Sequence, residues 1–319
     1  MDAPVKKTLI LIAGPTAVGK TSVSIQIAKH FHSEIISADA RQFYLELNLG
    51  TAKPTVEELA MAPHHFINHL SIHDDYSAGK FEQEAILLLD ELFLHHDVIA
   101  MVGGSGLFVK ALLDGIDSIP PTDDAINMKI KQLYKDEGLS SLQKLLKEHD
   151  PIYYEKVDLN NPHRLIRALT VCLSSGKPFS SFRTSKSKQR DFIAIKIGLE
   201  ADRKELYRRI NRRVDEMMQQ GLLEEAKELF PHRNLIALQT VGYHELFDFL
   251  EGKISLDKAV ELIKQNTRRY AKRQMTWFRK EKDMTWFQAG QFPEIIQFIE
   301  GKLNESNILI QREKSVVDS

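Results

Sequence analysis

The chain has 319 residues, of which 43% are hydrophobic and 27% are charged, enough apolar sequence for a substantial core and for more than one lobe. Its formal net charge of −1 argues against a general affinity for nucleic acid, but it does not describe how the basic residues are distributed. No segment approaches the roughly 18 to 20 consecutive apolar residues of a membrane span, and the segment from Met1 to Lys7 is too short and polar for a signal peptide. We therefore expect a cytoplasmic protein with no membrane partner. The single cysteine, Cys172, cannot form an internal disulfide, and its apolar neighbours predict a buried side chain.

The most informative segment is GPTAVGKT, which comes directly after the apolar run from Thr8 to Ala13 and directly before a helical pattern. This order of strand, loop and helix is the context of a phosphate-binding loop of the form GxxxxGK[ST]. Its backbone N–H groups point at phosphate oxygens, its lysine adds a positive charge, and its threonine hydroxyl is a ligand for Mg²⁺. The residues that we expect to hold the phosphates are Gly14, Pro15, Thr16, Ala17, Val18, Gly19, Lys20 and Thr21.

Short β-branched runs at Thr8 to Ala13, Glu34 to Ser37 and Val98 to Val102 alternate with helical patterns. This alternation predicts an α/β fold with a parallel sheet, here a P-loop NTPase-like core. The segment from Ala85 to Glu91, AILLLDE, resembles a Walker B strand ending in acids, but its apolar residues recur with a helical period. We therefore expect a helix there and discount Asp90 as a metal ligand.

The pattern changes after Pro120-Pro121 to helices without strands. Strand character returns in DFIAIKIG, from Asp191 to Gly198, which we expect to lie at the edge of the sheet. The predicted organisation is a first part of the core at residues 1–116, a helical insertion at 117–189, and a second part of the core with C-terminal helices at 190–319.

Asp39 lies just past the second predicted strand, where ligands gather in an open parallel sheet. Its position alone leaves open a metal ligand, a general base or a helix N-cap. The glycines from Gly103 to Gly106 permit a close approach to a ligand, although a plain tight turn explains them nearly as well. The histidines His64, His65, His69 and His73 invite a zinc interpretation, but no Cys or Glu completes a ligand set, which favours structural or substrate-edge roles.

Two stretches are strongly basic, Arg203 to Arg213 and Lys264 to Lys282. Either could be a solvated helix face. The second also contains Tyr270, Trp277 and Phe278, and aromatic side chains among basic ones favour contact with nucleic-acid bases and phosphates.

Taken in order, several motifs make the chain similar to tRNA dimethylallyltransferases, also called tRNA isopentenyltransferases. They are GPTAVGKT, ISADARQFY around Asp39, GTAKPT from Gly50, PHHF from Pro63, VGGSGLFVKALLDG from Val102, NPHRLIRAL from Asn161, TVGYHE from Thr240 and YAKRQMTWFRK from Tyr270. The resemblance runs from about Thr8 to Phe287 and includes long motifs that generic P-loop kinases lack. No C-terminal Cys/His zinc finger of the eukaryotic kind is present in the sequence, which favours a bacterial-type enzyme.

The resemblance implies transfer of a dimethylallyl group from dimethylallyl diphosphate to the exocyclic amine of the adenosine 3′-adjacent to the anticodon in tRNA. It implies Asp39 as general base, with Lys20, Thr21 and Arg213 as the other catalytic residues, Mg²⁺ on Thr21, and a helical insertion that grips the anticodon stem-loop. Nothing in the sequence demands more than a monomer. The implied tRNA-binding residues are Asp39, Ala40, Arg41, Gln42, Ser105, Asn127, His163, Arg164, Leu165, Ile166, Arg167, Gln239, Gly242, Tyr243, Arg273, Gln274, Trp277 and Arg279.

Two positions depart from the family pattern: Ser105 stands where Thr is usual and keeps the hydroxyl, whereas Asn127 stands where Arg is common and weakens one implied contact. Two other functions remain open on the sequence. A P-loop small-molecule kinase of the shikimate or nucleoside-monophosphate type shares the phosphate loop but has no use for the basic aromatic segment. A nucleotide-gated nucleic-acid binding protein without chemistry has no use for Asp39 beside the loop.

Overall fold

The computed structural model describes the backbone of residues 6–184, 187–281 and 283–317, with side chains to residue 305. The chain divides into two compact units. One combines the part before Asp114 with the part after Gln189, and the other is Asp114–Gln189. In the described part of the chain, no helix is both long and apolar enough to cross a bilayer.

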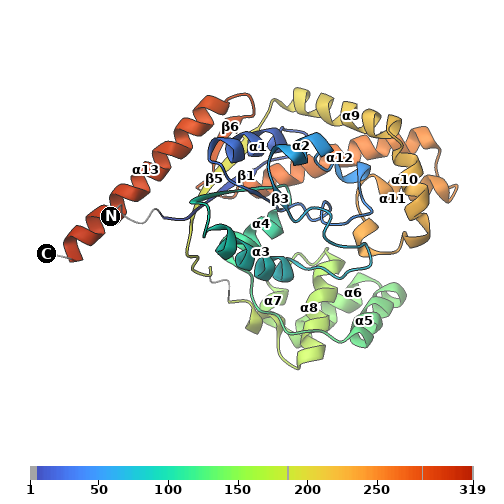
Figure 1. Ribbon diagram of the computed structural model, residues 1–319. Helices are drawn as coiled ribbons and strands as arrows, with labels where there is room; N and C mark the ends of the chain where they lie inside the picture. Colours follow the sequence, from blue (N-terminus) through green and yellow to red (C-terminus); the bar gives the residue numbers. More distant parts are fainter. Residues whose placement is uncertain (1–5, 185–186, 282, 318–319) are drawn as a thin grey trace. The chain divides into compact units, whose positions relative to one another are not determined.

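The larger unit is built on one parallel sheet (Figure 1). Its spatial order is β3-β2-β4-β1-β5-β6. The α/β, P-loop NTPase-like fold class predicted from the sequence is confirmed. The strands are β1 (Thr8–Ala13), β2 (Ile35–Ser37), β3 (His64–His65), β4 (Val98–Gly103), β5 (Ile193–Glu200) and β6 (Thr285–Gln288).

The position of β5 corrects one prediction. We expected this segment at the sheet edge, but β5 pairs with β1 on one side and with β6 on the other. The edge strand is β6, which comes far later in the chain. At the opposite edge, β3 has only two residues and pairs Ile35 with His64, too short a run for its sequence to predict.

Helices cover both faces of the sheet. The side chains of β1 show this, because successive residues point into two different hydrophobic cores. Leu9 and Leu11 belong to a core with residues of α3, α4 and α10 to α12, whereas Ile10 and Ile12 belong to a core with residues of α1, α9 and α13. These helices are α1 (Lys20–His30), α3 (Ala78–Leu92), α4 (Gly106–Asp114), α9 (Arg203–Gln219), α10 (Leu222–Leu229), α11 (Tyr243–Leu250), α12 (Leu256–Phe278) and α13 (Phe292–Val317), with the short α2 (Val56–Met61) before β3.

The Walker B-like segment is helical, as its periodicity predicted. It forms most of α3, with Ala85 and Leu89 buried and Asp90 exposed to solvent. The strand that follows is β4, which lies beside β1 and ends at the glycine-rich segment. Asp90 therefore does not lie at the carboxyl end of a strand.

The smaller unit is helical and has its own core. Leu142, Leu146, Leu165 and Leu169 are fully buried there, and Cys172 is buried as predicted. Its helices are α5 (Asp124–Glu137), α6 (Leu139–His149), α7 (Pro151–Tyr154) and α8 (Pro162–Ser175), followed by the 3₁₀ turn η2 (Phe179–Phe182).

Polar contacts at two places join segments of the smaller unit that are distant in the sequence. The fully buried carboxylate of Asp150 accepts hydrogen bonds from the Tyr153 and Ser180 backbone amides and from the Ser180 hydroxyl. Near the ends of the unit, the Lys188 amide donates to the Asp114 carbonyl at 2.7 Å. The chain therefore enters and leaves this unit at neighbouring points.

Candidate active site

The phosphate loop connects β1 to α1 and depends on its glycines. Gly14 has a φ of 151°, and a Cβ there would lie 2.6 Å from the Leu199 carbonyl oxygen. Gly19 has a φ of 109°, in the region that favours glycine, while Ala17 is held at a φ of 64°. The Lys20 ammonium folds back over the loop and donates to the carbonyls of Gly14 and Pro15 at 3.0 and 2.8 Å. These two hydrogen bonds thus hold the half-buried Lys20 ammonium against the backbone of the loop.

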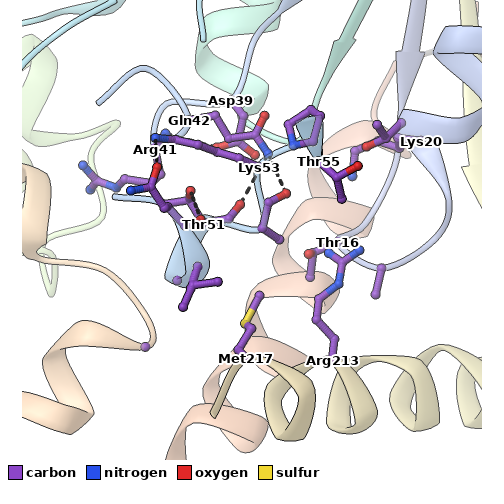
Figure 2. Close-up of a pocket in the computed structure, with 18 of the residues that line it drawn as sticks. Thr16, Lys20, Asp39, Arg41, Gln42, Thr51, Lys53, Thr55, Arg213 and Met217 are labelled. Carbon is purple, nitrogen blue, oxygen red and sulfur yellow. Dashed lines mark hydrogen bonds between the residues drawn. The ribbon is translucent and has the colours of Figure 1, made fainter. Parts of the chain in front are cut away.

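This loop forms one wall of a cleft of about 830 Å³ within the larger unit. Lys20, Thr21, Asp39 and Arg213, the four residues predicted to be catalytic, all line it. Figure 2 shows three of them, Lys20, Asp39 and Arg213. They come from the start of α1, the segment after β2, and α9. The sheet order explains the meeting, because β2 and β1 flank β4 and all three strands end at the same edge.

Positive charge dominates the phosphate-loop wall. Burial lowers the pKa of Lys20 to about 8; the negative charge of Asp39 opposes this shift and the positive charge of Arg213 adds to it. Burial likewise lowers the pKa of Arg213, against the raising effects of Glu216 and Glu58. Within the described chain, Arg213 has neither a hydrogen bond nor an ion pair of its own. Two cations that face one cleft suit an anionic ligand.

The Asp39 carboxylate is held by the backbone that directly follows it in the chain. Its Oδ1 accepts a hydrogen bond from the Arg41 amide at 3.1 Å, and the next amide, that of Ala40, donates to the Ser105 hydroxyl oxygen at 3.0 Å. Tyr270 of α12 reaches the same place. Burial raises the pKa of its phenol to about 12, with a further contribution from the charge of Asp39, while a hydrogen bond with Ser105 lowers it. Asp39, Ser105 and Tyr270 therefore form one cluster at the ends of β2 and β4.

The wall opposite the phosphate loop is the segment around the 3₁₀ turn η1 (Leu49–Thr51). The Glu225 carboxylate of α10 accepts hydrogen bonds from the amides of Leu49 and Gly50 and from the Tyr243 hydroxyl. Gly50 lies so close to the Tyr243 ring that a Cβ would meet it at 2.6 Å. This anchoring by Glu225 was not predicted, since nothing in the local sequence of α10 points to the cleft.

Lys53 extends the same wall, and Figure 2 shows it beside Gln42. Its ammonium donates to the carbonyls of Tyr44 and Leu45 and to the Asn48 side chain, and burial lowers its pKa to about 8. The Gln42 amide donates to the carbonyls of Thr51 and Ala52. The GTAKPT motif that contains Lys53 was noted in the sequence, but this role of the lysine was missed.

A sequence model of the family described as IPP transferase matches residues 42–281, more than half of the chain. The chain belongs to the IPP transferase family. It is similar to the tRNA dimethylallyltransferase of Christiangramia forsetii, with 54% identity over 93% of this chain and 98% of that protein. It is also similar to tRNA dimethylallyltransferase 1 of Bacteroides fragilis, with 48% identity over 93% of this chain and 99% of that protein. The resemblance recognised in the motifs is confirmed.

Solved structures of the family agree with this membership. The tRNA isopentenylpyrophosphate transferase of Bacillus halodurans matches with a TM-score of 0.71 and 36% identity, over 95% of this chain and 99% of that one. A eukaryotic dimethylallyltransferase, solved acting on tRNA, matches with a TM-score of 0.74 and 26% identity, over 89% of this chain and 74% of that one.

The RNA contacts that the family resemblance implies in the larger unit fall into two groups. Arg41, Gln42, Gly242 and Gln274 line the cleft, and Gln239, Arg273, Trp277 and Arg279 are exposed. The Arg41 guanidinium donates to the Gln239 carbonyl at 3.5 Å. Tyr243, by contrast, is fully buried, so its side chain packs in the core and does not face an RNA.

The implied RNA contacts of the smaller unit lie on α5 and α8. His163, Arg164 and Arg167 are exposed, and Asn127 and Ile166 are half-buried. Leu165 is fully buried in the core of that unit, which corrects the expectation that its side chain contacts RNA. The buried face of α8 contains Leu165, Ala168, Leu169 and Cys172, which recur at a spacing of three and four residues. Arg164 and Arg167 lie off this face and are exposed.

The histidine cluster does not form a metal site. His65 pairs with Glu34 at 2.6 Å, whereas His69 packs edge-on against Phe43, Phe66 and Tyr76. The Nδ1 of His64 bonds to the Ala62 carbonyl, and its Nε2 is buried without a partner among the residues described. No group of three or more His, Cys, Asp or Glu side chains suited to a metal occurs in the described part of the chain.

Proposed function

We propose that this protein transfers a dimethylallyl group from dimethylallyl diphosphate to the exocyclic amine of the adenosine 3′-adjacent to the anticodon in tRNA. The observation that carries the proposal is one cleft in which the phosphate loop, with Lys20 and Arg213, lies together with the Asp39 carboxylate. The names of the family members to which the chain is similar support tRNA as the acceptor and a dimethylallyl group as the group transferred.

The cations of the cleft suit a diphosphate leaving group. Lys20, Arg213 and the amides of the loop would hold its oxygens, and their positive charge favours the negative charge that grows on the diphosphate as the carbon–oxygen bond breaks. This arrangement needs no residue that attacks phosphorus. The exposed position of Asp90 agrees with this, because a Walker B acid would have to face the phosphate site.

Asp39 is proposed as the general base. The adenine amine nitrogen attacks the allylic carbon, the carbon–nitrogen bond forms, the carbon–oxygen bond to diphosphate breaks, and the amine proton passes to the Asp39 carboxylate. The hydrogen bond from the Arg41 backbone amide to Oδ1 fixes one carboxylate oxygen of Asp39 and leaves the other to accept the proton. A base inside a loop stack cannot reach this cleft, so the adenosine must be flipped out of the stack.

Magnesium fits the oxygen donors of the cleft. Thr21 supplies a hydroxyl oxygen beside the phosphate loop, the ligand that Mg²⁺ takes from a loop of this form. When bound, the ion would neutralise charge on the diphosphate. Because the described chain has no cluster of three acidic or histidine ligands, most of its coordination would come from diphosphate oxygens and water. Magnesium dependence is thus part of the proposal, with Thr21 as its protein ligand.

Action as a monomer is part of the proposal. Its tRNA substrate makes the cytoplasm the expected place of action. The family members found favour this transferase over the small-molecule kinase, and Asp39 in the cleft favours an enzyme over a binding protein without chemistry.

A transfer assay tests the proposal. The protein is incubated with Mg²⁺, unmodified tRNA and dimethylallyl diphosphate labelled in its prenyl group, and the RNA is then counted. We expect label in RNA, and none when the adenosine next to the anticodon is replaced or Mg²⁺ is chelated. Absence of transfer together with ATP-dependent phosphorylation of a small acceptor would replace the proposal with the kinase.

A further inference from the structure

Gln274 is a polar side chain buried beside the phosphate loop, although it belongs to a helix near the far end of the chain. It is 5% exposed. Its Oε1 accepts a hydrogen bond from the Thr16 amide at 2.8 Å, and its Nε2 donates to the Gly104 carbonyl at 2.9 Å. The two partners fix the orientation of the amide, because an N–H can bond only to the oxygen and a carbonyl only to the nitrogen.

The bridge joins two loops that belong to different strands. Thr16 lies in the phosphate loop after β1, and Gly104 follows β4. A Cβ on Gly104 would lie 2.1 Å from the Gln274 Nε2 and 3.8 Å from the Lys20 Nζ. The absence of a side chain at Gly104 therefore makes room for the glutamine amide next to the Lys20 ammonium.

The hydrogen bond from the Thr16 amide to Gln274 lies next to a strained residue of the loop. Ala17, the next residue, has a φ of 64°, which a residue with a Cβ adopts only when its surroundings hold it there. The hydrogen bond from the preceding amide, that of Thr16, to the buried Gln274 side chain is such a restraint. The same bond means that the Thr16 N–H is engaged by protein, so the amides left for phosphate start at Ala17.

α12 has two distinct faces at this point. Ala271, Gln274 and Phe278 are buried at helical spacing, whereas Lys272, Arg273 and Arg279 are exposed. Gln274 therefore lies on the face that packs against the loops and not on the basic face. Its sequence environment, YAKRQMTWFRK, is dominated by the basic face, which is why the family resemblance assigned it to RNA.

We propose that Gln274 is a positioning residue for the phosphate loop: its side-chain amide clamps Thr16 to Gly104 and so sets the shape of the diphosphate cradle. It contributes to affinity for the diphosphate and not to affinity for RNA. The inference rests on the proposed function, since it takes the ligand of the loop to be a diphosphate.

The test measures two affinities separately on the full chain. Inorganic pyrophosphate with Mg²⁺ is titrated calorimetrically, and an anticodon stem-loop RNA is titrated by fluorescence anisotropy. Gln274→Met keeps the length of the side chain and removes both hydrogen bonds. Gln265→Met, at an exposed position of the same helix, is the matched control. We expect Gln274→Met to weaken pyrophosphate binding about tenfold, the usual effect of leaving buried partners unpaired, and to change RNA affinity less than about twofold.

A double-mutant cycle protects the test against a folding defect. Gly104→Ala places a methyl where the Gln274 amide lies and should break the bridge from the other side. If the bridge is the cause, the double variant should bind pyrophosphate about as well as the weaker single variant. Thermal unfolding of each variant identifies any that are not folded at the assay temperature, and those are compared at a lower temperature.

The outcomes separate the inference from the function on which it rests. If the natural protein binds no pyrophosphate and transfers no prenyl group, the proposed function is wrong. Unchanged pyrophosphate affinity in Gln274→Met, or weakened RNA binding alone, would overturn the positioning role while the function stands. Losses that multiply in the double variant would also overturn it, because they would be independent.

Discussion

The two sides of the cleft are built in different ways. The phosphate side, residues 14–21 with Arg213, is mostly one continuous loop whose glycines determine its shape. The carboxylate side brings together Asp39, Ser105 and Tyr270 from three distant segments. A continuous loop carries its geometry in its own sequence, whereas a side assembled from separate segments depends on strand order and helix packing. We therefore expect substitutions on the phosphate side to change diphosphate affinity, and those on the carboxylate side to change turnover.

The largest expected effect is on the carboxylate side. Asp39→Asn keeps the shape of the side chain and removes the proton acceptor, so turnover should fall by about 10³-fold, within the usual range for a lost general base. Pyrophosphate and stem-loop affinities should stay within about threefold. Single-turnover transfer measures the first quantity, and calorimetry and anisotropy measure the second.

The control for this variant is Asp90→Ala, which removes the exposed Walker B-like carboxylate of α3. Its turnover should equal that of the natural protein. Full turnover in Asp39→Asn, or a large loss in Asp90→Ala, would reverse the assignment of the two acids.

On the phosphate side, Arg213→Gln should raise the KM for dimethylallyl diphosphate by about 10- to 100-fold, as expected for the loss of a charge-assisted hydrogen bond. The KM for tRNA should change little. The neighbouring Arg212 is exposed and paired with Glu216, so Arg212→Gln is a matched control with an expected KM like that of the natural protein. Steady-state kinetics in both substrates decide, and equal effects of the two substitutions would contradict the role of Arg213.

The next effect is a pH dependence. The Lys20 pKa of about 8 in the free protein means that the ammonium loses its proton above that pH, while a bound diphosphate favours the charged form. Apart from the ionisation of pyrophosphate itself, its affinity should therefore be constant below pH 8 and fall above it, by up to about tenfold per pH unit. Calorimetry from pH 6.5 to about 9.5 measures this.

Lys20→Arg is the comparison, because arginine remains protonated throughout that range. Its affinity is expected to be lower at pH 7 but without the additional fall above pH 8, and the ionisation of pyrophosphate itself is common to both proteins. Parallel pH profiles would mean that Lys20 does not titrate in the cleft.

The smallest effect concerns the basic face of α12, which should act through long-range charge. Arg273→Gln and Arg279→Gln should each lower the slope of log affinity for the stem-loop against log salt by about 1, with turnover on saturating RNA preserved. Arg208→Gln, exposed on α9 and paired with Glu205, is the control. An unaltered slope would leave the exposed face of α12 as a solvated surface.

The sequence predicted the phosphate side better than the carboxylate side for physical reasons. A loop of consecutive residues between a strand and a helix carries its own conformational restraints, and the helical period of AILLLDE was enough to exclude Asp90. It did not predict that β5 is internal, because the edge is created by β6, a segment nearly a hundred residues later. The two-residue β3 exists only through its pairing with β2 and has no periodicity of its own.

Burial of particular side chains was the other limit. Gln274, Tyr243 and Leu165 belong to motifs rich in polar or basic residues, yet each lies on the inner face of its helix. Which face is inner depends on partners such as Glu225 and Gly104 that lie elsewhere in the chain. Membership of a motif therefore does not determine which way an individual side chain faces.

The neighbouring ends of the helical unit have a consequence for the history of the chain. The Lys188 amide donates a hydrogen bond to the Asp114 carbonyl, and the Lys188 side chain packs on Gly115. The two ends of the helical unit therefore lie next to each other. An element attached in this way can be lengthened, replaced or removed by genetic insertion and deletion without changing the spacing of β4 and β5. A related protein could thus exchange the whole helical unit while the sheet and its cleft stay the same.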